Sequence, residues 1–179
     1  MFQIAKYEGG TQMSDLYSEW IVKRKKPAWA PFAKGGLLTL TVLCFLLSFT
    51  GILWFFVLIG AGLGYLTYRL SLEWDLEYEY IFVKGELDID KIMGKSRRKR
   101  CIVVDLESTE IVAPLNSHAL DAFKNNKCKE YDFSSRMPEA KPYVIYATVK
   151  NEMARILFEP NERMLNDMRS TAPRKVVLY

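Results

Sequence analysis

The sequence is poor in residues that bind transition metals or form disulfides. It has one histidine, His118, and three cysteines, Cys44, Cys101 and Cys128, which are far apart in the chain. There is no Cys-x-x-Cys pair, and a single histidine cannot complete a Cys/His zinc site. Glycine-rich phosphate loops and EF-hand spacing are absent too. We therefore expect neither a disulfide scaffold nor a bound metal or other cofactor.

Charged side chains are missing from residues 35–68. Asp, Glu, Lys and Arg make up 26% of the chain, yet these 34 residues include none of them and no histidine. A helix in the core of a soluble protein rarely needs so long an uncharged stretch. The gap predicts insertion into a membrane, and it argues against an ordinary cytosolic enzyme and against a disordered tail.

The uncharged stretch is too long for one upright helix. A single helix through it would be roughly 51 Å long, whereas the hydrocarbon core of a bilayer is about 30 Å thick. The segment Ser48–Gly51 is a turn signal near its middle, and it leaves halves of about 19 and 18 residues at 32–50 and 52–69. Each half can just cross a bilayer. The sequence thus predicts a two-helix transmembrane hairpin over residues 32–70.

Basic residues flank the predicted hairpin on both sides, and its turn has no charge. By the positive-inside bias, both termini are expected in the cytoplasm, which makes this a multi-pass protein of the cell membrane. The flanking cations are Lys23, Arg24, Lys25, Lys26 and Lys34 before the first helix and Arg69 after the second. The first four are also candidate contacts for anionic lipid or an anionic partner.

Gly60 and Gly64 form a G-x-x-x-G pattern in the second predicted helix. Small residues let two helices approach closely in a membrane. The pattern has two interpretations: contact with another protein or a second copy of the chain, or packing against the first helix of the same chain. Since a hairpin needs such a face in any case, packing within the chain is favoured.

Residues 1–31 are expected to form an amphipathic, basic segment next to the membrane. Ser14 is a suitable N-cap, and the pairs Leu16–Trp20 and Tyr17–Ile21 have helical spacing. This pattern predicts a short helix lying either on the membrane surface or against the soluble part of the protein.

Residues 71–179 predict a small β domain closed by a helix. Apolar and acidic residues alternate from Trp74 to Phe82 and, after the turn Lys84-Gly85, from Leu87 to Asp90, which indicates a hairpin with a solvated acidic face. Further strands are expected near residues 98–106, 110–113, 131–133, 143–149 and 153–158, with a short helix capped by Ser117. A final amphipathic helix starts near Pro160 and ends before Pro173. The fold class expected is α+β: a transmembrane α-helical hairpin followed by a small antiparallel β-barrel or sandwich with a C-terminal helix.

This order of elements is similar to that of a pleckstrin-homology-like (PH-like) domain. Three segments, residues 85–100, Tyr131–Ser135 and 158–176, also resemble a group of uncharacterised bacterial membrane proteins that join a twin-helix anchor to a cytoplasmic PH-like domain. The resemblance covers about residues 30–179. It implies topology and fold but no activity, because the group has no assigned catalytic residues.

A basic cluster is the most informative local feature. It consists of Lys95, Arg97, Arg98, Lys99 and Arg100. One interpretation is contact with anionic lipid or with an anionic partner, as PH-like domains often bind acidic headgroups with basic residues of strands and loops. Another is pairing across strands with Glu86, Asp88 and Asp90. Nucleic acid is the weakest interpretation, because the chain is tethered and its soluble half is neutral.

Residues suited to catalysis are not clustered. Ser117, His118 and Asp121 include the residue types of a hydrolase triad, but no G-x-S-x-G elbow accompanies them. We therefore expect a non-enzymatic, membrane-anchored module that presents a PH-like domain to anionic lipid or protein. The alternative is an accessory subunit of a transporter or membrane enzyme.

Overall fold

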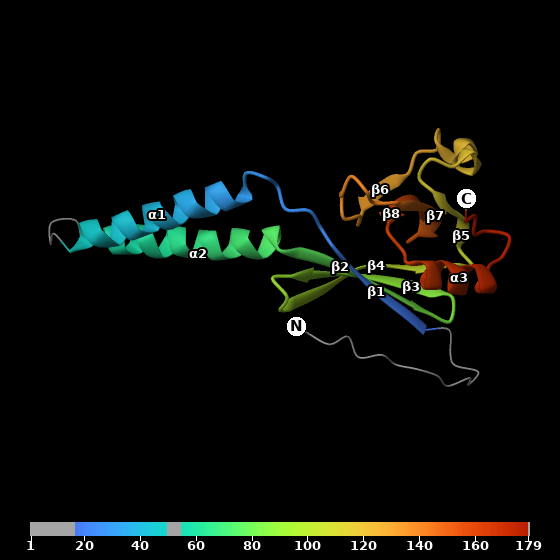
Figure 1. The fold of residues 1–179 in the computed structure, drawn as a ribbon, viewed down its shortest axis with the longest axis horizontal. Coiled ribbons are helices and arrows are strands. Elements are labelled where there is room, and N and C mark those ends of the chain that lie inside the picture. Colours follow the sequence, from blue (N-terminus) through green and yellow to red (C-terminus); the bar gives the residue numbers. More distant parts are fainter. Residues whose placement is uncertain (1–16, 50–54, 179) are drawn as a thin grey trace.

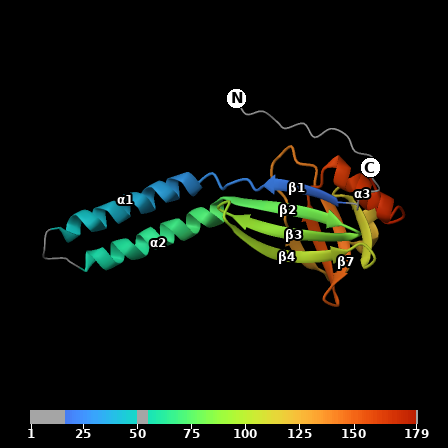
Figure 2. The same ribbon diagram turned by 90° about the horizontal axis from the view of Figure 1, so that it is seen from below.

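In the computed structural model two β-sheets face each other, and a long pair of helices extends from one end of them (Figures 1 and 2). The structure describes residues 17–49 and 55–178. The first sheet is antiparallel, in the order β1 (Tyr17–Lys23), β2 (Leu76–Val83), β3 (Glu86–Met93), β4 (Arg97–Asp105). The second has the order β5 (Thr109–Pro114), β7 (Tyr143–Val149), β8 (Glu152–Phe158), β6 (Lys129–Asp132). The sheets do not close into a barrel within the described residues, so of the two predicted arrangements the sandwich fits.

The predicted strands after residue 71 are present. Lys84 and Gly85 both have positive φ, at 50° and 95°, which gives the tight β2–β3 turn that alternating apolar residues on either side require. Lys150 and Asn151 also have positive φ, at 51° and 65°, and they form the tight turn between β7 and β8. One feature differs from the expected antiparallel sandwich: β6 pairs parallel to β8.

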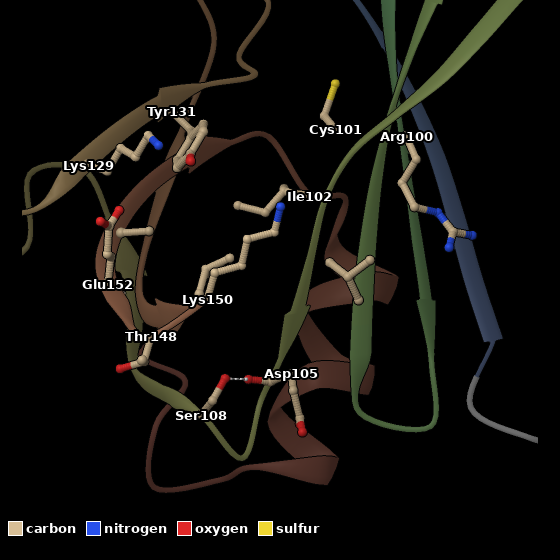
Figure 3. A pocket seen from close by; sticks show the side chains of 13 residues that line it. Arg100, Cys101, Ile102, Asp105, Ser108, Lys129, Tyr131, Thr148, Lys150 and Glu152 are labelled. Atoms are coloured by element: carbon tan, nitrogen blue, oxygen red, sulfur yellow. Dashed lines mark hydrogen bonds between the residues drawn. The ribbon is translucent and has the colours of Figure 1, made fainter.

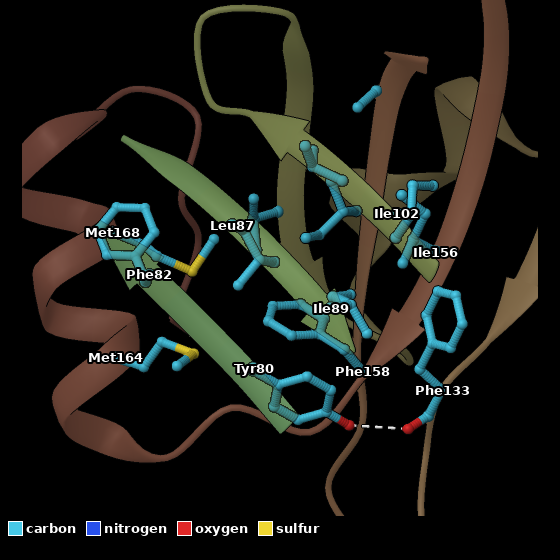
Figure 4. Close-up of a cluster of buried hydrophobic side chains, with 14 of the residues drawn as sticks. Tyr80, Phe82, Leu87, Ile89, Ile102, Phe133, Ile156, Phe158, Met164 and Met168 are labelled. Carbon is cyan, nitrogen blue, oxygen red and sulfur yellow. Dashed lines mark hydrogen bonds between the residues drawn. The ribbon is translucent and has the colours of Figure 1, made fainter. Parts of the chain in front are cut away.

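The core lies between the two sheets, and Figure 4 shows its centre. Tyr80 is fully buried, and its ring meets Phe158 edge-on at 5.7 Å between centroids. Its hydroxyl donates to the Phe133 carbonyl oxygen over 2.8 Å, so the one polar atom of this side chain is satisfied inside the core.

The predicted C-terminal helix is confirmed as α3 (Glu162–Thr171). Asn161 is its N-cap, since the side-chain oxygen accepts from the backbone N–H of Met164 over 2.8 Å. Met164, Leu165 and Met168 form the buried face, as their spacing predicts, and they close one end of the core. The predicted Ser117 cap is also present, on the 3-10 helix η1 (His118–Phe123).

The helix pair consists of α1 (Ala30–Ser48) and α2 (Phe56–Trp74). Among the described residues, α1 alone is long and apolar enough to cross a membrane, by length and composition. The α2 helix runs past the uncharged stretch to include Arg69 and Glu73. The predicted turn at residues 48–51 lies partly outside the described residues.

The prediction of an amphipathic helix before the hairpin is wrong, because these residues form β1. Strand β1 pairs antiparallel with β2, with Lys23 opposite Glu77, and the Arg24 N–H continues the ladder to the Leu76 carbonyl over 2.9 Å. The predicted cap Ser14 and Leu16 lie outside the described residues. The helix pair is therefore inserted into the β1–β2 connection, and the first sheet includes residues on both sides of the predicted boundaries at 31 and 71.

The expectation of a solvated acidic face on β2 and β3 is wrong at two positions. Glu79 and Asp90 lie directly opposite each other, and their exposed fractions are only 2% and 6%. Neighbouring long side chains, including that of Arg98, cover these two carboxylates on the outer face of the sheet.

Candidate functional site

The end of the first sheet next to the helices is the candidate site, and we call it the rim. It consists of the β1–α1 connection (residues 24–29), the last turn of α2 and the β3–β4 turn (residues 94–96). The Gly94 N–H donates to the Asp75 carbonyl over 2.8 Å, which joins the β3–β4 turn to the end of α2 (Figures 1 and 2). Gly94 has φ +55°, and a Cβ there would collide with the Leu72 side chain. A side chain at this position would force Leu72 to move, and the positive φ also favours glycine.

Three of the four consecutive cations at the start of the rim pair within the protein. Lys26 contacts Asp75 at 2.9 Å, and Lys23 contacts the same carboxylate at 3.8 Å. The hydrogen bond from Lys26, with the charges of both lysines, holds the pKa of Asp75 below its usual value. Arg24 donates to the Tyr78 hydroxyl and lies 3.5 Å from Asp132. The side chain of Lys25 is exposed and has no acidic partner among the described residues.

Strand β4 divides the predicted basic cluster between two faces of the sheet. Arg98 and Arg100 lie on the outer face, where Arg98 pairs with Glu79 and Asp90, and Arg100 lies 3.3 Å from Asp88. For these two residues the structure shows the cross-strand pairing that was one interpretation of the cluster. Burial raises the pKa of Glu79, and the Arg98 guanidinium opposes that shift.

The other three members of the cluster form no ion pair in residues 17–49 and 55–178, although the charge of Lys95 contributes to the lowered pKa of Asp75. Lys95 lies in the β3–β4 turn at the rim. Arg97 and Lys99 lie opposite Met93 and Lys91, on the side of the sheet that faces the second sheet. All three side chains are exposed, so their charges are available to a partner outside the chain.

The two glycines of the G-x-x-x-G pattern face the other helix of the pair. A Cβ on Gly60 would lie 3.4 Å from the Cys44 Cβ and from the Phe45 ring, and one on Gly64 would lie 3.7 Å from Thr41. At the rim, the rings of Trp29 and Trp74 join the two helices edge-to-face, at 5.5 Å between centroids. This geometry favours packing within the chain over contact with a partner as the role of these glycines.

A groove of about 640 Å³ opens between β4 and the second sheet (Figure 3). Its walls come from β4 on one side and from β6 and the β7–β8 hairpin on the other. The residues that line it include Arg100, Ile102, Lys129, Tyr131, Lys150 and Glu152. Both basic and apolar side chains therefore border the same space.

Comparison with known proteins gives a family. The sequence model of a family described as "Bacterial PH-like domain (DUF6106)" matches residues 14–178. The chain belongs to this family. The match begins before β1 and ends after α3, so it includes the helix pair, and it starts earlier than the resemblance seen at residue 30. No curated protein and no solved structure matches the chain.

The triad-like residues of the PH-like domain take structural positions. The Ser117 hydroxyl accepts from the Ala119 N–H over 3.3 Å, and His118 and Lys124 both contact the Asp121 carboxylate. His118 and Asp121 are exposed. Ser117 caps the start of η1 and the charged side chains pair with each other on its surface, so the three residues are not arranged to direct a base at the serine hydroxyl. No group of His, Cys, Asp and Glu that could hold a metal occurs in the described part of the chain.

Sequence reasoning missed the role of Asp132, which lies in one of the segments that carry the family resemblance. Its carboxylate accepts from Ser134 and Arg136 over 2.7 Å each and lies 3.5 Å from Arg24. Burial alone raises the pKa of Asp132, but the hydrogen bonds from Ser134 and Arg136 outweigh it and leave the pKa below its usual value. Asp132 thus ties the second sheet to the connection that leads into α1.

Proposed function

We propose that this protein is a non-enzymatic module whose helix pair anchors in the cell membrane and holds the PH-like domain at the anionic cytoplasmic face, for binding of lipid or protein. The observation that carries this proposal is the contrast between the helices and the domain. The domain buries its apolar side chains between two sheets, whereas the helix pair exposes them: Phe32 is 82% and Leu58 68% exposed. Such a surface is costly in water and favourable in lipid.

The position of the helix pair in the fold supports one topology. The chain leaves the first sheet at Lys23 and returns at Leu76, on adjacent strand ends. If both helices enter the membrane, the segments before and after them must lie on the same side. The cations at the rim favour the cytoplasmic side by the positive-inside bias.

The rim has the charge expected for contact with anionic headgroups. Each lysine or arginine near such a surface contributes about 1 kcal/mol. The rim cations that form no ion pair in the described residues are Lys25 and Lys95, and Lys34 and Arg69 lie on the adjoining turns of α1 and α2. We infer that these four, rather than Arg98 and Arg100, make the lipid contacts.

Two measurements test this proposal. Full-length protein expressed in bacteria is expected in the membrane pellet after a carbonate wash; recovery in the supernatant would contradict the anchor. For lipid contact, hydrogen exchange of the β3–β4 turn is compared in nanodiscs of phosphatidylcholine with and without phosphatidylglycerol. We expect slower exchange with the anionic lipid, abolished by Lys25→Ser/Lys95→Ser and retained in Lys141→Ser/Arg163→Ser, a control away from the rim.

The second candidate function, an accessory subunit of a transporter or membrane enzyme, is favoured by Gly62. A Cβ there meets nothing within 4 Å, so Gly62 leaves an open notch on α2. Gly60→Leu is expected to separate α1 from α2 and lower the melting temperature of the purified monomer. Gly62→Leu should leave the monomer unchanged, and loss of a co-purifying membrane protein in that variant alone would favour the subunit function.

A further inference from the structure

Strand β4 is an edge strand whose backbone borders the groove. It pairs with β3 on one side, and in the part of the chain that the structure describes no strand pairs with its other side. Four consecutive β4 residues, Arg100–Val103, line the groove. The β3–β4 register shifts within this segment, so Cys101 has no partner in β3, and the four residues border the groove along the unpaired edge of β4. Such an edge can accept another strand.

Two lysines face each other beside this edge without a compensating acid. Lys91 and Lys99 are directly opposite in the β3–β4 register, on the same side of the sheet as the buried Tyr78. Like charges in this position destabilise a sheet. Neither lysine forms an ion pair within residues 17–49 and 55–178, in contrast to Arg98 and Arg100 on the opposite face. This uncompensated pair indicates an anionic partner from outside the chain.

The opposite wall of the groove adds two more cations. Lys129 lies with its ammonium 5.9 Å from the centre of the Tyr131 ring, and Lys150 is exposed on the β7–β8 turn; neither pairs with an acid of the described chain. Figure 3 shows Lys129 beside Tyr131, across the groove from Ile102 of β4, and the Lys150 side chain extending towards Ile102. The acids that line the groove are Asp105 and Glu152.

We propose that this groove binds an extended acidic segment of a partner protein, which adds as a strand to the free edge of β4. Main-chain hydrogen bonds to β4 supply the affinity common to strand addition. Alternate side chains of the added segment would lie beside Arg97 and Lys99, which share one face of β4, with Lys91 next to Lys99, so acidic residues at every second position are selected. Apolar residues further along the same face of the segment are compatible with Ile102 and Tyr131, which line the groove.

The experiment uses the full-length protein in nanodiscs of phosphatidylcholine alone, so that it is independent of binding to anionic lipid. A random library of peptides about as long as β4, nine residues, is panned against these nanodiscs. We expect selected peptides with Asp or Glu at alternating positions. Lys91→Glu/Lys99→Glu keeps a like-charged pair, and therefore comparable stability, while reversing its sign. This variant should weaken peptide binding by about tenfold or more.

The matched control is Lys141→Glu/Arg163→Glu, which changes net charge equally on exposed residues outside the groove and should alter binding by less than about twofold. Hydrogen exchange of β4 backbone amides should slow when peptide binds, as strand addition requires. The proposal is overturned if no acidic peptide is selected, if selected peptides bind the double variant equally well, or if β4 amides are not protected. Complete displacement by inorganic phosphate or phosphatidylglycerol vesicles would instead assign the lysines to a phosphate site and also overturn it.

Discussion

Two carboxylates on the outer face of the first sheet rely on Arg98 for charge compensation. Glu79 and Asp90 are nearly buried and lie opposite each other, and Arg98 contacts both. Removing the guanidinium leaves two buried acids without a cation. Since Arg98 is itself half-exposed, Arg98→Ala is expected to lower the free energy of unfolding at neutral pH by about 1–3 kcal/mol. Denaturant unfolding of the purified protein in detergent measures the change.

Glu79 determines how this loss depends on pH. Because the pKa of Glu79 is raised in the folded protein, the protonated form of Glu79 stabilises the fold. This stabilisation is complete at pH values below the unfolded pKa of about 4.3, and it is lost as the pH rises through the folded pKa. The penalty of Arg98→Ala should therefore shrink near pH 4, and Glu79→Gln should recover part of it at neutral pH. Lys99→Ala, the matched control, should not destabilise the sheet. An equal penalty at both pH values would refute this account.

Asp132 should show the opposite pH dependence. Its lowered pKa stabilises the fold above the unfolded pKa of about 3.9, and this stabilisation is lost as pH falls through the folded pKa. Asp132→Asn is expected to lower the free energy of unfolding by about 1–2 kcal/mol at neutral pH, a range that allows for the partial exposure of Asp132. The variant should also lose less stability than the wild-type protein when the pH is lowered. The control is Asp121→Asn on exposed η1, for which little change is expected. An unaltered loss of stability at low pH in Asp132→Asn would contradict the assignment.

At the scale of elements, the β3–β4 turn is joined to α2 through Gly94. Gly94→Ala places a methyl group against Leu72 in a left-handed backbone conformation, so it should loosen the contact between the sheet and the helix pair. We expect a loss of about 1–3 kcal/mol in unfolding free energy, partly recovered by Leu72→Ala. Gly36→Ala, where a Cβ meets nothing within 4 Å, is the control. Equal stability of the two single variants would show that the close approach is not needed.

The elements after residue 71 could be predicted because their patterns are regular. Alternation marked β2 and β3, and a Pro-bounded apolar stripe marked α3. Strand β1 could not be predicted, because its two faces both mix apolar and polar residues: Tyr17 and Ile21 accompany Glu19 and Lys23 on the outer face. The helical spacing of the apolar residues in so short a segment was then the stronger signal.

The candidate site was only partly predictable for a related reason. The sequence located the basic cluster, but the face on which each cation lies depends on register, and the β3–β4 register shifts between Ile89 and Asp90. That shift places Arg98 and Arg100 with the acids and Lys99 with Lys91. The groove walls come from β4, β6 and the β7–β8 hairpin, which are distant in sequence, so no local pattern shows that they meet.

At the scale of the whole molecule, the helix pair is an insertion into a β-hairpin. Lys23 lies opposite Glu77, so the ends of β1 and β2 are already adjacent without the helices. A chain in which residues 27–73 are replaced by Gly-Gly is therefore expected to keep both sheets and their shared core. It should also lack the exposed apolar surface of α1 and α2, which is the surface proposed to lie in lipid.

We predict that this joined chain is recovered in the soluble fraction, with near-ultraviolet circular dichroism typical of packed aromatic residues. A chain of residues 76–178, which lacks β1, is the matched comparison. It leaves the inner-face residues Tyr78 and Tyr80 uncovered beside a new edge at β2, so it should aggregate or unfold at lower temperature. If the two chains were equally soluble and stable, β1 would not be an integral strand. If the joined chain still pelleted with membranes, the helix pair would not be the only anchor.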